Sequence, residues 1–302
     1  SIYANSPSGD TNIEGGSAGT DFTTNLVASY NFDTDFTDYT GNNDLTANGD
    51  VIAGVTGGKV SDCAEFDGNG DYAVTSDSSD FSFANVSEDI PFTIGFWVKF
   101  NSVGNRQTII MRRGTSAQNG GWQLDWDSSN KFRLILADQS SINNRLTATF
   151  PLTPVIGTWY NIVYTYDASA TIGGIKGYLN GVSQTITDES AGTYTQMPYT
   201  DENITIGTES FDLGDKILDG LLDELHVWKN RELSSAEVLE IYNTENGGTS
   251  ILPALPSPTG LLADYPNAAA AYSLRNLIST NTNVVRVRRS SDNAEQDFSA
   301  TE

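Results

Sequence analysis

Short runs of alternating apolar and polar residues, separated by Gly, Asn, Asp and Ser, follow one another from about residue 25 to residue 243. The clearest run is Phe92–Phe100, where the even-numbered positions are apolar and Thr93 and Lys99 lie on the opposite side. A period of two is typical of a strand with one buried face. Asn180-Gly181 is a strong signal for a tight hairpin turn. Many strands without intervening helices predict antiparallel sheets, packed as a sandwich or a barrel.

A single helix is predicted directly after the last of these strands. Ser234 and Glu237 have the spacing of a capping box, in which the Ser oxygen accepts from a backbone amide and the Glu side chain reaches back. Gly247-Gly248 then offers a stop. We therefore expect one short helix to accompany the sandwich.

The two ends of the chain differ in composition from the strand-rich region. Residues 1–22 are rich in Gly, Ser, Thr and Asn, which predicts an extended N-terminal arm. The sandwich is expected over residues 23–248. Three prolines within residues 249–259 indicate a linker, and residues 260–302 form a C-terminal assembly segment.

The chain is strongly acidic, with 16 Lys and Arg against 39 Asp and Glu and a net charge of −23. Such a surface repels phosphate backbones, so nucleic acid is not expected as a partner. The apolar runs are all shorter than the roughly 18 residues of a membrane span, so no span is expected. Cys63 is the single cysteine, which excludes an intramolecular disulfide; we expect its thiol to pack as a small apolar group.

Four blocks of the strand-rich region resemble the laminin-G-like, concanavalin A-like jelly-roll superfamily. The blocks are Ala64–Tyr72, Phe92–Lys99, Gly157–Tyr160 with Tyr178–Gly181, and Ile206-Gly207 through Leu218–Leu225. Their order and spacing match the family over residues 26–243. The resemblance implies an all-β, antiparallel two-sheet jelly-roll sandwich with one short helix. The same fold carries lectins, adhesion modules and glycosidases, so it leaves the function open.

The C-terminal segment carries a second resemblance. We expect a helix over 266–280 and a basic strand over 284–289, which are too little for an independent core and need cover from the sandwich or another subunit. Ala270–Arg275 and Val285–Asp297 resemble a segment common in bacteriophage virion and tail proteins, and are also similar to the opening of an arabinofuranosidase-like catalytic domain. The resemblance implies a virion setting, with other virion proteins or further copies of this chain as partners, and a trimer in the case of a fibre.

Carboxylates gather where the sandwich begins and where it ends. Asp33 and Asp38 lie after the first predicted strand, and Asp223 lies in the last. In many members of the resembled family these two strands are neighbours tied by calcium, a cation that prefers oxygen ligands. We therefore expect Asp33, Asp38 and Asp223 to hold a structural Ca²⁺. The alternative is turn chemistry, in which Asp side chains bond their own backbone.

Gln123, Asp125 and Asp127 share one face of a predicted strand. Glucanases of the resembled superfamily use a Glu-x-Asp-x-Glu run, in which one Glu attacks and the other donates a proton. Gln123 replaces the first Glu and cannot be a nucleophile, so we expect no catalysis. His226 is the single histidine, which leaves a Ser–His triad or a multi-His zinc site poorly supported.

Aromatic side chains near loops are candidates for sugar binding, because the C–H faces of sugars pack on aromatic rings. The alternative is burial in the core, which we expect for Trp97, Trp159 and Trp228. The candidate ligand-binding residues are Trp122, Trp126, Tyr194 and Tyr199.

These expectations describe a noncatalytic structural or binding protein of a phage particle, in a tail, a fibre or the capsid surface. Its sandwich would bind cell-surface glycans or neighbouring virion proteins. Two alternatives remain open: a secreted or cell-surface bacterial module of the lectin type, and a glycoside hydrolase that uses Asp125 and Asp127. The first interpretation implies a location on the virion surface, and the bacterial module implies the extracellular space or the cell surface.

Overall fold

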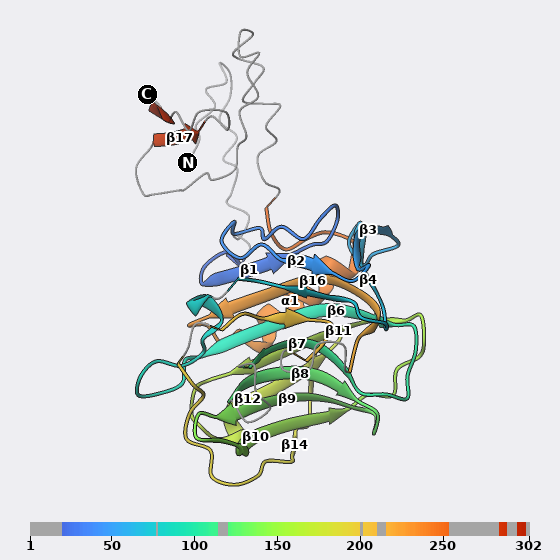
Figure 1. Ribbon diagram of the computed structural model, residues 1–302, viewed down its shortest axis with the longest axis vertical. Coiled ribbons are helices and arrows are strands. Elements are labelled where there is room, and N and C mark those ends of the chain that lie inside the picture. The colour runs from blue at the N-terminus through green and yellow to red at the C-terminus, as the bar shows by residue number, and fades with distance from the viewer. Residues whose placement is uncertain are drawn as a thin grey trace, which may run out of the picture.

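Two antiparallel β-sheets lie face to face, with one helix outside them (Figure 1). The computed structural model describes residues 20–76, 78–113, 120–199, 202–209 and 216–253, and the backbone of 284–288 and 295–299. The expected fold class, an antiparallel two-sheet sandwich with one short helix, is confirmed. The described helices are too short or too polar to cross a bilayer.

The first sheet, called sheet A, has the strand order β13-β12-β11-β6-β16-β4-β3, with β1 paired to β16. Its long central strands β6 and β16 pair along most of their length. The bounds are β1 (Leu26–Tyr30), β3 (Ile52–Thr56), β4 (Asp62–Asp67), β6 (Phe92–Phe100), β11 (Trp159–Tyr166), β12 (Ile175–Leu179), β13 (Val182–Gln184) and β16 (Asp219–Lys229).

The second sheet, called sheet B, has the order β14-β10-β9-β8-β7-β15-β5-β2. Two short 3₁₀ turns, η1 (Ser79–Phe81) and η2 (Ile172–Gly174), lie in the connections. The strands are β2 (Thr46–Asn48), β5 (Tyr72–Val74), β7 (Gln107–Arg113), β8 (Gly121–Asp127), β9 (Lys131–Asp138), β10 (Ser141–Pro151), β14 (Thr187–Asp188) and β15 (Thr205–Ile206).

The main core fills the space between the two sheets, because each central strand turns its alternate apolar residues inward. From β6 these are the even-numbered residues of Phe92–Phe100, all of which are buried. From β8 they are Trp122, Leu124 and Trp126. Stacked rings, such as Phe83 on Trp122, add to the apolar area removed from water. The alternating pattern therefore predicted which face points between the sheets. The opposite face of β6 is buried as well, because the helix covers it: Thr93 and Trp97 are 0% and 1% exposed, and Trp97 stacks on Tyr242.

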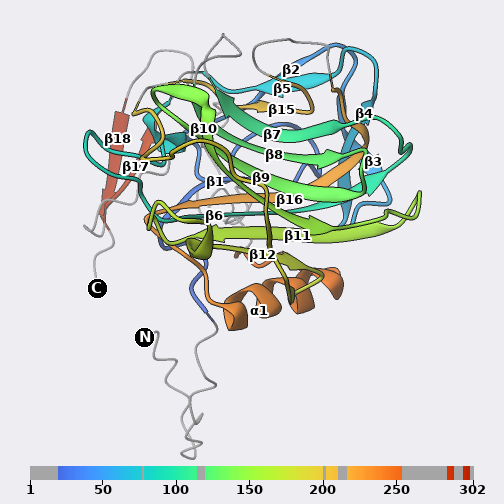
Figure 2. The same ribbon diagram turned by 90° about the horizontal axis from the view of Figure 1, so that it is seen from below.

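The helix α1 (Ser235–Asn246) begins at the expected capping box, which is confirmed. Ser234 Oγ accepts from the Glu237 amide, and Glu237 accepts from the Ser234 amide. The helix covers sheet A on the side away from sheet B (Figure 2). A second apolar cluster forms there from Phe22, Val163, Tyr178, Trp228, Leu233, Val238, Ile241 and Leu252.

Both ends of the described body pack into this second cluster. Trp228 donates its indole N–H to the Phe22 carbonyl over 2.8 Å, and Leu252 is buried in the same cluster. The chain therefore enters and leaves the body on the α1 side of sheet A. The end of the predicted arm and the start of the predicted linker are thus packed against the sandwich.

The C-terminal segment is described only in part. The expected strand over 284–289 is present as β17 (Val284–Arg288), and it pairs with a second strand that was not predicted, β18 (Glu295–Ser299). The expected helix over 266–280 lies outside the described residues.

Candidate functional site

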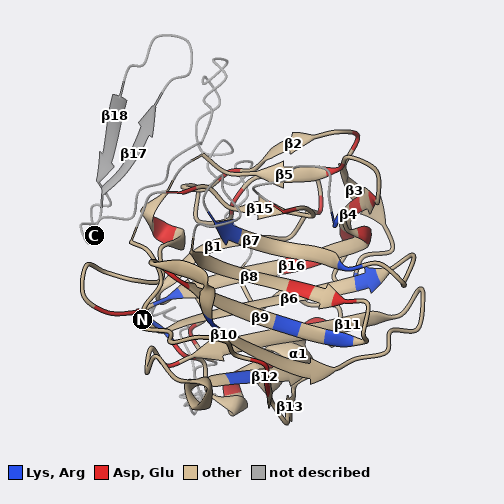
Figure 3. Cartoon of the chain, turned by 60° about the horizontal axis from the view of Figure 1, so that its bottom comes forward, with Lys and Arg blue, Asp and Glu red and all other residues tan. Residues whose placement is uncertain are grey.

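The outer face of sheet B carries a constellation of charged side chains. Strand β8 alternates, so that Gln123, Asp125 and Asp127 point away from the core. Asp125 lies opposite Arg133 of β9. Acidic positions on β8 lie beside basic positions on β9 in Figure 3. The sequence put these polar residues on one strand face, and the structure adds their partners from other elements.

The Asp125 carboxylate is the centre of this face and is fully buried. Its Oδ1 accepts from Arg133 Nε over 2.7 Å, and its Oδ2 accepts from Arg106 Nε and Gln123 Nε2 over 2.8 and 2.9 Å. Arg106 also pairs with Glu209 at 2.9 Å. Charge-assisted bonds of this kind fix the guanidinium planes, which remain partly exposed at the surface.

The edge of the same face holds further ion pairs. Arg133 Nη1 lies 3.0 Å from Asp127, Lys216 lies 3.1 Å from Glu209, and Lys131 pairs with Glu189. The ion pairs named on this face join four Lys and Arg to four Asp and Glu, a balance of charge in a protein of net charge −23. Burial raises the pKa of Asp127, but the Ser129 hydrogen bonds and Arg133 outweigh it and hold that pKa below its usual range. The face therefore presents fixed donors beside ionised acceptors.

Two of the four expected sugar-binding aromatics are core residues. Trp122 and Trp126 are 0% and 1% exposed, and their indole N–H groups donate to the carbonyls of Phe81 and Leu152. Both occupy even positions of β8, which face inward. The expectation that they stack on a sugar is corrected by this burial.

The other two expected aromatics lie in the segment between β14 and β15. Tyr194 is half-buried and donates its hydroxyl to Asp89 over 2.6 Å, whereas Tyr199 is 52% exposed. Tyr199 therefore has most of its ring available to a ligand. Of the three tryptophans expected in the core, Trp97 and Trp228 are buried and Trp159 is half-buried.

The first and last strands of the sandwich are neighbours, as expected, since β1 pairs with β16. The carboxylates predicted to bind calcium there accept from backbone amides. Asp38 accepts from the amide of Ser29 over 2.8 Å, Asp33 from that of Asp62 over 3.0 Å, and Asp223 from those of Lys59 and Val60. Asp38 also makes the local turn bond that was the alternative to a metal, with the Thr40 amide, whereas Asp33 and Asp223 accept from amides far along the chain. Calcium at these three carboxylates stays a prediction.

Two groups of side chains in the described part of the chain have ligand atoms within 4.8 Å of one another. One is Asp50, Asp67 and Asp71, of which Asp67 ends β4 and the other two lie on loops; the other is Glu224, His226 and Glu245. Neither includes Asp33, Asp38 or Asp223. Both groups contain residues that the sequence did not single out as ligands.

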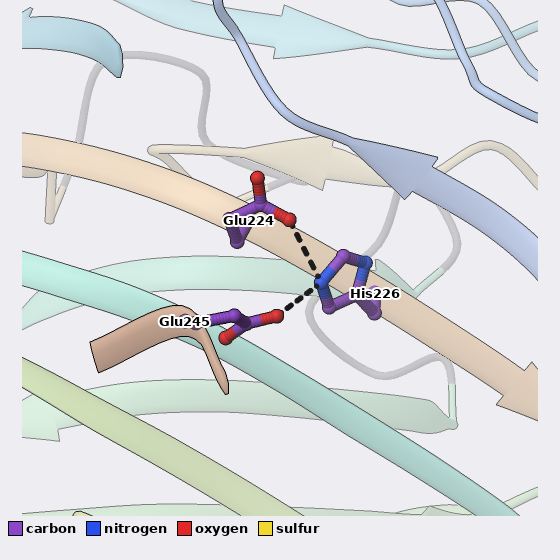
Figure 4. A group of neighbouring side chains, drawn as sticks. All are labelled: Glu224, His226 and Glu245. Carbon is purple, nitrogen blue, oxygen red and sulfur yellow. Dashed lines mark hydrogen bonds and ion pairs between the residues drawn. The ribbon is translucent and has the colours of Figure 1, made fainter. Parts of the chain in front are cut away.

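We call Glu224, His226 and Glu245 the Glu-His-Glu cluster (Figure 4). All three side chains are buried, two on β16 and one in the last turn of α1. His226 Nε2 lies 2.9 Å from Glu245 Oε1 and 3.2 Å from Glu224 Oε2. Burial lowers the pKa of His226, but the two glutamates outweigh it and raise that pKa to about 9. The sequence offered one signal, Glu and His two residues apart on a strand, but no sign of the third member.

Similar folds occur in proteins that bind carbohydrate. Domain 4 of AbnA, a GH43 extracellular arabinanase from Geobacillus stearothermophilus, solved in complex with arabinotriose, has a TM-score of 0.51 at 19% identity. The match covers 72% of this chain and 98% of that domain. The binding domain of botulinum neurotoxin serotype C1 has a TM-score of 0.55 at 16% identity, over 73% of this chain and 52% of that domain.

A third match is the binding domain of botulinum neurotoxin DC in complex with SialylT, with a TM-score of 0.52 at 15% identity, over 73% of this chain and 52% of that one. The chain thus spans about half the length of the neurotoxin binding domains. No curated protein sequence matches the chain. The model of the "Concanavalin A-like lectin/glucanases superfamily" matches residues 67–239, more than half of the sequence. The chain therefore belongs to the concanavalin A-like lectin/glucanase superfamily.

Proposed function

We propose that the chain is a noncatalytic carbohydrate-binding module that acts outside the cell, with the outer face of sheet B as its ligand-binding surface. The observation that carries this proposal is the network around Asp125, which holds guanidinium and carboxylate groups in fixed positions on strands β8 and β9 and at the ends of β7 and β15. Sugar hydroxyls both donate and accept hydrogen bonds, so alternating fixed donors and acceptors suit them. The arabinanase domain and the toxin domain solved with saccharide ligands support the same assignment.

The same residues argue against hydrolysis. A retaining glycosidase needs two carboxyl groups about 5–5.5 Å apart, one to attack and one to donate a proton. Gln123 is an amide, and the neighbouring Asp125 carboxylate is enclosed by Arg106, Arg133 and Gln123. An enclosed carboxylate that accepts from two guanidiniums is poorly placed to attack a sugar or to give up a proton.

The places where the chain enters and leaves the described body support a tethered module. Phe22 and Leu252 leave the body beside α1, on the outer side of sheet A. The proposed binding face lies on the opposite sheet, so a tether to a larger protein or particle leaves it free (Figure 2). This arrangement suits a module of an extracellular or cell-surface protein. It does not distinguish one carrier from another.

A virion location has less support than this extracellular assignment. It rests on residues 270–297, most of which lie outside the described residues. The similar structures reported above are binding domains of a secreted enzyme and of toxins. Docking on a virion protein, or self-association through the C-terminal segment, is the role we propose for that segment if the chain belongs to a phage.

The binding face is tested by removing a rim charge from it and, as a control, from the other sheet. Lys131→Ala breaks a pair with Glu189 on sheet B whose side chains are about a third exposed, and Lys176→Ala breaks a partly exposed pair with Glu232 on sheet A. Exposed pairs contribute about 0–1 kcal/mol, so both variants should fold as the wild type does. After a glycan array has identified a ligand, titration calorimetry should show weaker binding for Lys131→Ala only. Equal affinity of the two variants would place the ligand elsewhere.

Calcium is the ion we propose for the group Asp50, Asp67 and Asp71. Its members offer oxygen atoms alone, which hard cations prefer, and they join loops of both sheets. An ion that binds only the folded state at 100 times its dissociation constant adds about 2.7 kcal/mol. EGTA should therefore lower the melting temperature, and added Ca²⁺ should restore it. Identical melting curves with and without EGTA would remove calcium from the account.

A further inference from the structure

The Glu-His-Glu cluster brings two carboxylate oxygens to the same ring nitrogen. His226 Nε2 lies 2.9 Å from Glu245 and 3.2 Å from Glu224, and no member is more than 1% exposed (Figure 4). Two buried anions cannot share this spot unless a positive charge lies between them. The cluster is neutralised by a proton on Nε2, by a proton on a carboxylate, or by a metal ion.

Each member of the cluster also forms a hydrogen bond with a group outside the cluster. Ser29 Oγ lies 2.8 Å from His226 Nδ1, and Trp97 donates its indole N–H to the far oxygen of Glu245 over 2.6 Å. Ser250 donates to Glu224 Oε2, the oxygen that also faces His226, over 3.1 Å. When Ser29 Oγ accepts a hydrogen bond from the Nδ1–H group of His226, Nε2 carries no proton and its lone pair points at the two carboxylates. Outer partners that fix the tautomer of a His and the orientation of its neighbours are typical of metal sites.

Glu224 supplies an independent observation. Its Oε1 atom is buried and has no hydrogen-bond partner, an arrangement that is rare for a charged group. Its backbone has a φ of 45° at a β-bulge between Asp223 and His226, a conformation that non-glycine residues seldom adopt. A strained backbone thus holds a carboxylate with an unused oxygen beside His226, and such strain gathers at binding sites.

A divalent ion fits the charge of the cluster. Two carboxylates and a neutral imidazole carry a charge of −2, which a divalent cation cancels in full. The nearby carboxyl groups of Asp223 and Asp33 add no positive charge. Lys59 bonds Asn246 and lies over the Trp97 ring rather than in the cluster.

We propose that the Glu-His-Glu cluster binds one Zn²⁺ ion, with His226 Nε2, Glu245 Oε1 and the Glu224 carboxylate as ligands. Imidazole nitrogen with carboxylate oxygen is a zinc ligand set, whereas calcium takes oxygen alone. Glu224 Oε2 faces His226 and supplies the third ligand atom, and the unpartnered Oε1, turned away from His226 in Figure 4, would supply a fourth if the carboxylate rotates toward the ion. The ion would fasten the end of α1 to the bulge of β16, beside β1 and the segment that leaves the body. Its role is structural, and it is separate from the glycan face on sheet B.

Elemental analysis of protein purified without a polyhistidine tag tests this directly. After dialysis against ZnCl₂ and then metal-free buffer, we expect about one zinc per chain, a higher melting temperature than for chelator-treated protein, and release of a proton on binding at pH 7. Cobalt should substitute and give visible absorption bands of four-coordinate intensity. Protein that retains no zinc and melts at the same temperature with and without it would overturn the proposal.

Three variants test which residues bind the ion. His226→Asn and Glu224→Gln should each lose the zinc, and Asp71→Asn, in the other acidic group, should keep it. The metal content of the wild type decides the question even if His226→Asn does not fold. Zinc retained by the folded Glu224→Gln variant, or lost from Asp71→Asn, would show that the ion binds elsewhere and would overturn the assignment.

Discussion

Replacing Asp125 with alanine is expected to lower the free energy of unfolding by about 3–5 kcal/mol. The carboxylate is fully buried and accepts from Arg106, Arg133 and Gln123. Its removal leaves two guanidiniums and an amide beside one another without their shared acceptor. Like charges then repel in a partly desolvated place, which is why the loss exceeds that of an ordinary surface pair. Urea denaturation followed by tryptophan fluorescence gives the difference.

The control for this variant is Glu189→Ala, on the same outer face. Glu189 pairs with Lys131, and both side chains are about a third exposed, so its loss should change stability by about 0–1 kcal/mol. Comparable losses in the two variants would mean that the Asp125 network is an ordinary solvated ion pair. The binding face would then lack the fixed geometry that we assign to it.

The second large effect is expected for Trp122→Ala, at about 3–5 kcal/mol. The indole is fully buried, stacks on Phe83 at a centroid distance of 5.1 Å and donates to the Phe81 carbonyl. Its removal opens a cavity between the sheets and leaves that carbonyl without its indole donor. Thermal unfolding measured by circular dichroism should show a large drop in melting temperature.

Tyr199→Ala is the matched aromatic control. Tyr199 is 52% exposed, so its removal should change stability by less than about 0.5 kcal/mol. If Trp122 instead stacked on a sugar at the surface, Trp122→Ala would reduce glycan binding and leave the melting temperature unchanged. That outcome would contradict the inward direction of the even positions of β8.

The fold was predictable because its signals are local. The alternation in Phe92–Phe100 depends on residues two apart, and the capping box depends on Ser234 and Glu237 three apart. Both survive in the structure, since packing of the sheets and of α1 rewards the same pattern. The direction of Trp122 was available from the same alternation, because polar Gln123 and Asp125 flank the inward positions. Its nearness to a loop outweighed that pattern and gave the wrong face.

The candidate sites depend on contacts between residues far apart in the chain, which the spacing of residues in the sequence does not predict. Asp125 meets Glu209 through Arg106, across 84 positions of chain, because β7 and β15 are neighbours in sheet B. Glu245 reaches His226 because α1 packs on sheet A, which places the last turn of a helix over a β-bulge. Neither juxtaposition follows from the spacing of residues. The bonds of Asp33 and Asp223 depend on the fold in the same way, because both carboxylates accept from backbone amides far away in the chain.

The central claim, that the outer face of sheet B binds carbohydrate, is tested most directly by mapping amide chemical shifts of isotope-labelled protein during titration with a glycan. Arabinotriose is the first probe, because a similar domain was solved with it, followed by ligands from the glycan array. We predict shifts that saturate and concentrate on Gln123–Arg133 and around Glu209. Saturating shifts confined to α1 and sheet A, or no shifts with any glycan, would contradict the account.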